Sequence, residues 1–491
     1  MGNRILKISN VNKTIHYLRK NGLRHAFYAA KERIEEEKKT DYVYKEPDEE
    51  RLAAQRAEQG RFPYRFSIVV PAYETKERYL RELLDSVIKQ SYEKWELIIA
   101  DAGKSRRVEE IVAAYQEKES RIRYLRLTEN GGISENTNAG IEAASGDYIG
   151  LLDHDDILAP DALYEMARAV HASETAKNKK TPVLLYSDED KFENNGSYRT
   201  PHIKEKFNFD LILSNNYICH FMMVRADCMK SLKLRGKYDG AQDYDLVLRI
   251  VRRLLCDVPP EHADNNVSAA SVPPKHADNN VPVASVPTTE LADSIVHVPF
   301  VLYHWRCHEQ STADNTASKM YAYEAGKAAL EDFCDSLGWN VQVSHSLHLG
   351  FYQITYRPDI LTVRRDVGIV GGRILDGHNR IISGIYNKEG KRLYRGLHKE
   401  YSGGSTHRAR QMQDCAAVDI RCMRLCEKMR PIFEEITGIP YRETGKQKLA
   451  DVSGISCDEA GYGKLSMELG RAARKMGFLV VWDARMTIKL K

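Results

Sequence analysis

Three carboxylates fall within four positions at Asp153-His154-Asp155-Asp156. Carboxylates this close together repel one another unless a cation is present. The apolar run 148–152 before them predicts a buried strand, which would hold them in place at its end. Carboxylate oxygens with open coordination positions suit Mg²⁺ or Mn²⁺ and a diphosphate. The competing interpretation is an acidic loop in which Asp156 or Asp161 caps the next helix.

Strand and helix patterns alternate before this acidic cluster. Apolar runs at 67–70, 96–100, 122–125 and 148–152 predict strands, and segments around 80–88, 107–117 and 134–144 predict helices between them. This alternation predicts an α/β fold with a doubly wound, mostly parallel sheet flanked by helices. Ligands of such sheets bind at the carboxyl ends of the strands. Pro71, Asp101 and Asp153 all stand at predicted strand ends.

Several strings in this region form an ordered set. They are Phe66-Ser67-Ile68-Val69-Val70-Pro71-Ala72-Tyr73, Asn130-Gly131-Gly132, Asn136-Thr137-Asn138 and Leu151-Leu152-Asp153-His154-Asp155-Asp156, followed by the runs 240–246 and 303–308. As a set, over about residues 64–330, they resemble a family 2 glycosyltransferase of the GT-A fold. The N-terminal extension resembles that of bacterial cell-wall and capsular polysaccharide enzymes, rhamnan-type enzymes included.

The resemblance implies a donor site for a nucleotide sugar, either a UDP-sugar or a dTDP-sugar. Its donor-binding residues would be Pro71, Ala72, Tyr73, Asp101, Asn136, Asp153 and Arg306. Pro71, Ala72 and Tyr73 would line the nucleotide pocket. Asp101 would hydrogen-bond the base or the ribose, unless it is an ordinary helix cap. Asn136 would lie beside the donor, unless its side-chain amide only caps a turn. Arg306, and also Lys319, would pair with diphosphate oxygens.

A metal site is implied by the same resemblance. Mg²⁺ or Mn²⁺ would neutralise the charge on the leaving nucleoside diphosphate. Asp155 would be the main ligand, Asp153 its partner nearer the ribose, and His308 would complete the shell, with His304 as the alternative.

The family pattern implies an inverting single displacement, which needs a base for the proton of the acceptor hydroxyl. Asp243 is the preferred base, although a carboxylate there also favours the start of a predicted helix over 244–252. Asp188 and Asp190, which we expect at the end of a strand over 183–186, are rival bases or bind acceptor hydroxyls. The acceptor would be a growing polysaccharide or a lipid-linked glycan.

Composition shifts divide the chain into three expected parts. Residues 1–62 form a helical N-terminal extension, residues 63–340 the GT-A domain, and residues 358–491 a degenerate, partial GT-A-like domain. Within the second part, residues 257–290 repeat a HADNN-containing string and are expected to be a disordered insertion. The third part carries only Glu468 where a second acidic motif would fall, so we expect a packing, acceptor-binding or dimerising role there.

The bulk composition narrows the function classes. A net charge of +4 over 491 residues argues against a nucleic-acid binder. The nine cysteines without a CxxC pair fit a reduced chain, and no apolar run is long enough for a membrane span or a signal peptide, so we expect a cytoplasmic protein. Residues 1–34 hold eight Lys and Arg against Glu32 alone, so this basic amphipathic helix either packs on the protein or lies on the inner face of the membrane.

Two other functions compete with glycosyl transfer. A sugar-phosphate nucleotidyltransferase would share the sheet and the acidic metal site, but it usually has a glycine-rich loop where this chain has Pro71-Ala72-Tyr73-Glu74-Thr75. The same lack of glycine disfavours a dinucleotide-binding dehydrogenase. The third possibility is a non-catalytic scaffold that binds sugar nucleotides, because the insertion separates Asp243 from His308.

Overall fold

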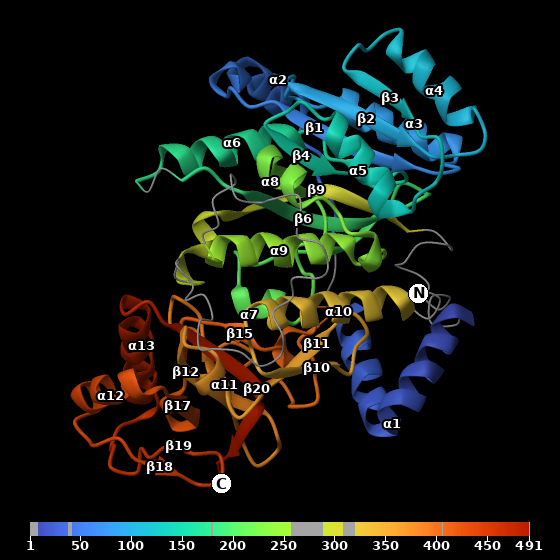
Figure 1. Ribbon diagram of the computed structural model, residues 1–491. Coiled ribbons are helices and arrows are strands. Elements are labelled where there is room, and N and C mark those ends of the chain that lie inside the picture. Colours follow the sequence, from blue (N-terminus) through green and yellow to red (C-terminus); the bar gives the residue numbers. More distant parts are fainter. Residues whose placement is uncertain are drawn as a thin grey trace.

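The computed structural model describes residues 8–37, 42–177, 180–256, 288–307, 320–404 and 406–490 (Figure 1). His308, Lys319 and most of the expected insertion 257–290 lie outside these ranges. Helices and strands carry the labels shown in Figure 1.

The predicted parallel sheet is confirmed. Its first strands are β1 (Phe66–Ala72), β2 (Trp95–Asp101), β3 (Ile122–Arg126) and β4 (Tyr148–Leu151), in the spatial order β3-β2-β1-β4, and all three pairings are parallel. The intervening helices are α3 (Glu77–Ile88), α4 (Arg107–Gln116) and α5 (Ile133–Ala143). Every residue of β2 is buried, because helices cover both faces of the sheet.

The second half of this sheet is mixed. From β4 the order continues through β8 (Met222–Arg225), β6 (Leu184–Glu193), β9 (Ile295–Cys307) and β5 (Ile157–Leu158), and β7 (Tyr198–His202) pairs with β6. The connecting helices are α6 (Ala162–Thr175), α7 (Phe209–Ile212), α8 (Ala226–Leu232), α9 (Gln242–Cys256) and α10 (Met320–Ser336). The strand predicted to end at 186 instead continues to Glu193, since it pairs in parallel with β9 over its whole length.

A second, smaller sheet occupies the C-terminal region. Its order is β13 (Ile381–Ser383), β12 (Val367–Leu375), β20 (Leu479–Lys489), β15 (Gln413–Asp414), with β17 (Met423–Leu425) beside β12. The other elements there are the hairpin β10 (Val341–His345) and β11 (Tyr352–Tyr356), α11 (Ile360–Val363), β14 (Ile385–Tyr386), β16 (Ala417–Val418), α12 (Arg430–Thr437), β18 (Glu443–Thr444), β19 (Leu449–Ala450) and α13 (Glu459–Lys475). Val370 and Val481 of this sheet pack in the same apolar core as α9, so the two regions adhere through buried surface.

The N-terminal extension contacts both regions. Helix α1 (Ile8–Glu37) is broken at Gly22, where φ is 80°. It lies beside the C-terminal region, and Glu32 accepts hydrogen bonds from the amides of residues 402–404. Helix α2 (Glu49–Glu58) instead packs on α6, where Arg51 contacts Asp161 and Glu165. None of the helices in the described ranges combines the length and the apolar content that crossing a membrane requires.

Candidate active site

The carboxyl ends of the parallel strands meet at one edge of the sheet. The register pairs Ala72 with Asp101, and Leu152 at the end of β4 donates its amide to the carbonyl of Val69 in β1. The predicted nucleotide-pocket segment, Asp101 and the acidic loop are therefore neighbours. Tyr73, the first residue after β1, exposes 41% of its surface, whereas Ala72 is buried.

Asp156 anchors the acidic loop from inside the protein. Its fully buried carboxyl group accepts hydrogen bonds from the hydroxyl of Tyr303 and from the amide of Arg306, 2.7 Å away. Burial raises the pKa of Asp156 well above its usual range, and the nearby carboxylates of Asp155 and Asp153 raise it further. The expected helix-cap role is wrong for Asp156, because its oxygens are used to tie the loop to β9. Asp161 occupies the cap position of α6 without a side-chain capping bond.

Asp153 turns the other way, toward solvent. Its side chain is 43% exposed, and its Oδ2 lies 4.0 Å from the Nε2 of His220. The backbone carbonyl of Asp155 is held by Arg306. Asp153 and Asp155, two positions apart in one loop, are both only partly buried. This donor set fits Mg²⁺ or Mn²⁺, which bind one or two protein carboxylates and complete their shell with phosphate oxygens and water.

His220 is a site residue that sequence analysis missed. Strand β8 runs antiparallel to β4 with Tyr148 opposite Arg225 and Gly150 opposite Met223. Continuing that register beyond the strand ends places His220 opposite Asp153, as the contact between them shows. The imidazole stacks on the ring of Tyr303 at 4.7 Å and 14°. The only sequence signal was its position directly before a short apolar strand.

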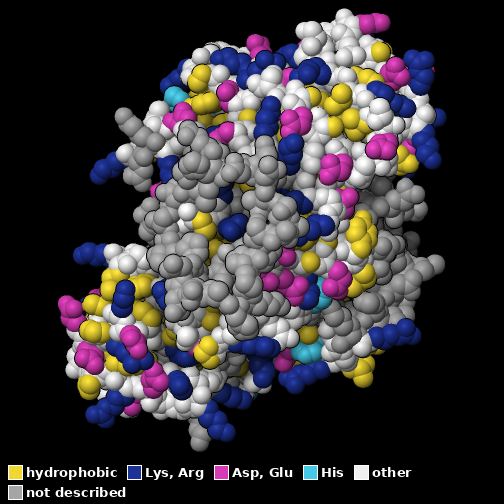
Figure 2. All heavy atoms as spheres, viewed as in Figure 1, with side chains coloured by type: hydrophobic (Ala, Val, Ile, Leu, Met, Phe, Trp, Pro, Cys, Tyr) yellow, Lys and Arg dark blue, Asp and Glu magenta, His cyan; other side chains and the backbone are white. Residues whose placement is uncertain are grey.

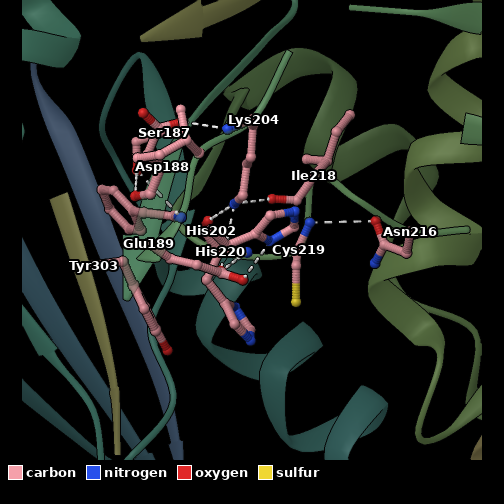
Figure 3. A network of polar contacts seen from close by, with 12 residues as sticks. Ser187, Asp188, Glu189, His202, Lys204, Asn216, Ile218, Cys219, His220 and Tyr303 are labelled. Carbon is pink, nitrogen blue, oxygen red and sulfur yellow. Dashed lines mark hydrogen bonds and ion pairs between the residues drawn. The ribbon is translucent and has the colours of Figure 1, made fainter. Parts of the chain in front are cut away.

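A buried ion pair holds the loop that presents His220 (Figure 3). The Nζ of Lys204, which is fully buried, lies 3.4 Å from Glu189 and donates hydrogen bonds to the carbonyls of Ile218 and His220. The same oxygen of Glu189, Oε2, accepts a hydrogen bond from the backbone amide of His220 at 3.1 Å, and its Oε1 lies 3.1 Å from the Nδ1 of His202. Burial alone would raise the pKa of Glu189, but Lys204 and His202 hold it well below its usual range. The loop is therefore fixed by charge-assisted hydrogen bonds.

Asp243 lies in the first turn of α9, on the same side as this loop. Its Oδ2 accepts a hydrogen bond from the amide nitrogen of Asn216 at 2.8 Å. Burial raises the pKa of Asp243, His220 opposes that rise, and the carboxylate of Asp153 adds to it. The Oδ1 of the same Asn216 accepts the backbone amide of Cys219 at 3.3 Å, so Asn216 ties Asp243 to the loop that presents His220. A carboxylate with a raised pKa is a stronger base than an ordinary aspartate.

The predicted donor-binding side chains have structural partners. The carboxylate of Asp101 accepts hydrogen bonds from the amide of Gly103, the hydroxyl of Tyr124 and the guanidinium of Arg126. The side chain of Asn136 bonds to Asn130 and to the amide of Gly131, which organises the turn before α5. Both residues sit at the expected edge of the sheet. Asn136 also has the turn-capping role that competed with donor binding. Asp101 holds the turn at Gly103 but does not cap α4, whose cap residue is Arg106.

Arg306 and His304 lie elsewhere than expected. The guanidinium of Arg306 is fully buried, between the rings of Tyr79 and Phe192, and it pairs with Glu82 at 2.6 Å. It cannot reach a diphosphate and instead pins the acidic loop. His304 is buried 2.7 Å from Asp190, so it is not available as a metal ligand.

Asp188 and Asp190 are interior residues of β6, not exposed strand ends. Asp188 accepts hydrogen bonds from the backbone amide of Lys204 and from His297, both within 2.8 Å, and Asp190 is paired with His304 and the hydroxyl of Tyr42. Their oxygens are used inside the protein, because β6 lies between β8 and β9 in the sheet. The structure thus does not place them where an acceptor could bind. His308, the predicted third ligand, is outside the described residues, and within them no three His, Cys, Asp or Glu side chains are gathered as a metal cluster.

Part of the chain matches a family profile. Residues 67–232 match a profile described as Glycosyl transferase family 2. An uncharacterised protein of Sinorhizobium fredii is 33% identical over 268 residues, which is 54% of this chain and 25% of that protein. The O-antigen biosynthesis protein RfbC of Myxococcus xanthus is 31% identical over 280 residues, 57% of this chain and 18% of that protein. The chain therefore spans a quarter or less of these two relatives.

Two further matches are shorter or more distant. An uncharacterised glycosyltransferase of Methanocaldococcus jannaschii is 30% identical over 191 residues, which is 38% of this chain and 64% of that protein. The crystal structure of Staphylococcus aureus TarS 1–349 in complex with UDP-GlcNAc aligns with 55% of this chain and 72% of that chain, at 15% identity and a TM-score of 0.37.

Proposed function

We propose that this chain transfers a sugar from a nucleotide-sugar donor to a hydroxyl group of a polysaccharide or lipid-linked glycan, because residues 67–232 match the profile of glycosyl transferase family 2. The observation that carries the proposal is the contact of His220 with Asp153 beyond the end of β4, together with Asn216, which links Asp243 to the loop of His220. Residues 63–340 form the catalytic unit in this proposal, and residues 358–491 support it.

The donor would bind across the ends of β1, β2 and β4. The segment Pro71-Ala72-Tyr73 and Asp101 would face the nucleoside part of a UDP- or dTDP-sugar. Asn136 shapes the adjacent turn. Asp153 and Asp155 would hold Mg²⁺ or Mn²⁺, with His308 as the proposed third ligand. The bound cation would neutralise the charge that develops on the leaving diphosphate.

Asp243 would act as the base of an inverting single displacement. Its carboxylate takes the proton of the acceptor hydroxyl while the hydroxyl oxygen bonds to the anomeric carbon. The bond from that carbon to the donor phosphate breaks, and the nucleoside diphosphate leaves with the bonding electron pair. The raised pKa of Asp243 suits this task, because it increases the affinity of the carboxylate for the proton. His220, beside Asp153, supplies a hydrogen-bond donor or a positive charge near the diphosphate.

The test measures nucleoside diphosphate release from a panel of UDP- and dTDP-sugars with Mn²⁺. We expect release with at least one donor, and we expect Asp243→Asn to lower kcat by about 10²–10⁴-fold. Asp227→Asn is the matched control, since Asp227 is also in the first turn of a helix but pairs with Arg225, at the opposite end of β8 from His220. Nucleotide binding without any release would favour the non-catalytic scaffold. Consumption of a nucleoside triphosphate with a sugar phosphate would favour the nucleotidyltransferase.

Helix α1 would bring this activity to the inner face of a membrane. Leu23 and Phe27 are exposed by 79% and 64% and lie one turn apart, with Ile34 on the same face. An exposed apolar stripe on a basic helix binds anionic lipid surfaces. The wild type should therefore co-sediment with phosphatidylglycerol vesicles. Leu23→Ser with Phe27→Ser should abolish this, whereas Met476→Ser, at an exposed apolar residue of the C-terminal region, should not. Co-sedimentation that the double substitution leaves unchanged would contradict the membrane contact.

A further inference from the structure

Tyr303 of β9 contacts both of the loops that form the candidate active site. The side chain is fully buried, and β9 lies between β6 and β5 in the sheet. Its hydroxyl group reaches the acidic loop after β4, whereas its ring meets the loop that presents His220 (Figure 3). These two loops come from distant parts of the sequence. One buried side chain is therefore placed to fix where they lie relative to each other.

The hydroxyl group of Tyr303 forms two hydrogen bonds with the acidic loop. It donates to the Oδ2 of Asp156 and accepts from the backbone amide of Asp153 at 3.4 Å. A phenol carries one proton and can also accept a hydrogen bond, so these two contacts use the group in both senses. They fasten the residues on either side of Asp155. The positions of the two proposed metal ligands, Asp153 and Asp155, thus depend on this hydroxyl group.

The ring of Tyr303 orients the imidazole of His220. The two rings stack with centroids 4.7 Å apart and 14° between their planes, and Trp305 meets the imidazole edge-on at 6.1 Å. Tyr303 and Trp305 are two positions apart in one strand, so both side chains lie on the same face of the sheet. The hydrogen bonds from Glu189 and Lys204 involve only the backbone of His220. The direction of its ring therefore comes from the aromatic contacts.

Tyr186 of β6 is a tyrosine of the same sheet whose contacts are purely internal. It is also fully buried, stacks on His297 at 5.1 Å, and donates its hydroxyl proton to a backbone carbonyl at 2.6 Å. The side chain of His297 is only 7% exposed. The partners of Tyr303 instead reach the surface, since the side chain of His220 is 19% exposed and that of Asp153 is 43% exposed. Tyr303 thus acts on groups that a ligand can reach.

We propose that Tyr303 is the positioning residue of this site: its hydroxyl group sets the acidic loop for a divalent cation, and its ring aims His220 at Asp153. Its effect on sugar transfer rests on the proposed function, whereas the positioning of the two loops does not. Because the hydroxyl group and the ring act on different loops, substitution can separate their roles. Tyr303→Phe removes the hydroxyl group and keeps the ring, and Tyr303→Leu removes both.

The experiment uses two measurements that need no turnover. Electron paramagnetic resonance measures Mn²⁺ binding, and NMR of ring-labelled histidine follows the imidazole of His220, whose signal is the one missing in His220→Gln. Tyr303→Phe should weaken Mn²⁺ binding about tenfold, because a buried carboxyl group of the acidic loop loses a hydrogen bond. The same variant should keep the His220 signal in place. Tyr303→Leu should also move that signal, because a stacked aromatic ring shields the protons of its neighbour.

Tyr186→Phe and Tyr186→Leu are the matched controls, and both should leave Mn²⁺ binding and the His220 signal unchanged. If Tyr303→Leu does not fold, Mn²⁺ binding by Tyr303→Phe still tests the role of the hydroxyl group. Four results would overturn the proposal: no Mn²⁺ binding by wild type, unchanged binding in Tyr303→Phe, equal losses in Tyr303→Phe and Tyr186→Phe, or an unmoved His220 signal in folded Tyr303→Leu. Nucleoside diphosphate release is measured alongside. A wild type that binds Mn²⁺ but cleaves no donor would contradict the proposed function alone.

Discussion

The Nε2 of His220 lies 4.0 Å from the Oδ2 of Asp153, where the antiparallel pairing of β4 and β8 brings two strand ends together. This relationship links the acidic loop to a loop that carries no recognisable motif. Asp243, on a third element, is tied to the loop of His220 through Asn216, which donates to its Oδ2 and accepts the amide of Cys219. The candidate site is thus assembled by the sheet register.

His220→Gln should lower kcat for nucleoside diphosphate release about 10²-fold, because it removes a group that can carry a proton or a positive charge beside the diphosphate. The Tm should change little, since the backbone amide of residue 220 still bonds to Glu189. Steady-state kinetics with varied donor and Mn²⁺ measure this. His345→Gln, in the distant hairpin where His345 contacts Glu324, is the control and should retain full activity. A normal kcat in His220→Gln would remove this residue from the proposed site.

Lys204→Met should destabilise the protein by about 3–5 kcal/mol, because it leaves the carboxylate of Glu189 buried without its cation. The same change should lower kcat by freeing the loop that presents His220. Urea unfolding gives the free energy, and kinetics give kcat. The double substitution Lys204→Met with Glu189→Gln removes both charges, so it should be less destabilised than the sum of the single changes. Strict additivity would show that the ion pair does not hold this loop.

The sequence predicted the local features of this site and missed its long-range pairings. Apolar runs and their spacing are local, so they predicted the succession of β1 to β4 along the chain and the acidic loop after β4. The partner of a charged side chain is not local. Arg306 stands about 150 residues from the Asp155 carbonyl that it binds, and Asp188 about 110 from His297. Only the fold shows whether a charged side chain is buried with a protein partner or is free to bind substrate.

Arg306→Met should act on stability and metal affinity, not on donor contacts. The guanidinium holds the carbonyl of Asp155 and pairs with Glu82 while it is fully buried. Its loss should cost about 3 kcal/mol in the free energy of unfolding and should weaken apparent Mn²⁺ binding. Arg78→Met is the matched control, since exposed Arg78 pairs with the same Glu82, and it should have little effect. If Arg306→Met kept its stability and raised only the KM for donor, the diphosphate role expected from the sequence would be restored.

Asp243→Asn should separate stability from activity. Burial raises the pKa of Asp243, so the ionised carboxylate is costly in the folded state at neutral pH. The neutral amide avoids this cost, and its oxygen can still accept from Asn216. We expect an equal or higher Tm together with the loss of kcat, whereas the stability difference from wild type should shrink as the pH falls and Asp243 becomes protonated. A large fall in Tm would show that the carboxylate is structural.

His407 should make stability depend on pH between about 4 and 6.5. Burial lowers the pKa of His407 from 6.5 to about 4, and the nearby charge of Arg410 adds to this. The folded protein therefore keeps this imidazole neutral where the unfolded chain binds a proton. Stability from this residue is complete above the unfolded pKa and is lost as the pH falls toward the folded pKa, by up to about 3 kcal/mol.

Urea unfolding of wild type and His407→Asn across this pH range measures that contribution. The difference in unfolding free energy between wild type and His407→Asn should change by most of about 3 kcal/mol from pH 7 to pH 4, because all other titrating groups are common to both proteins. His345→Asn is the control, since His345 is paired with Glu324 at the surface of the hairpin and should leave the pH profile parallel to that of wild type. A His407→Asn profile parallel to wild type would mean that His407 is hydrated in the folded protein.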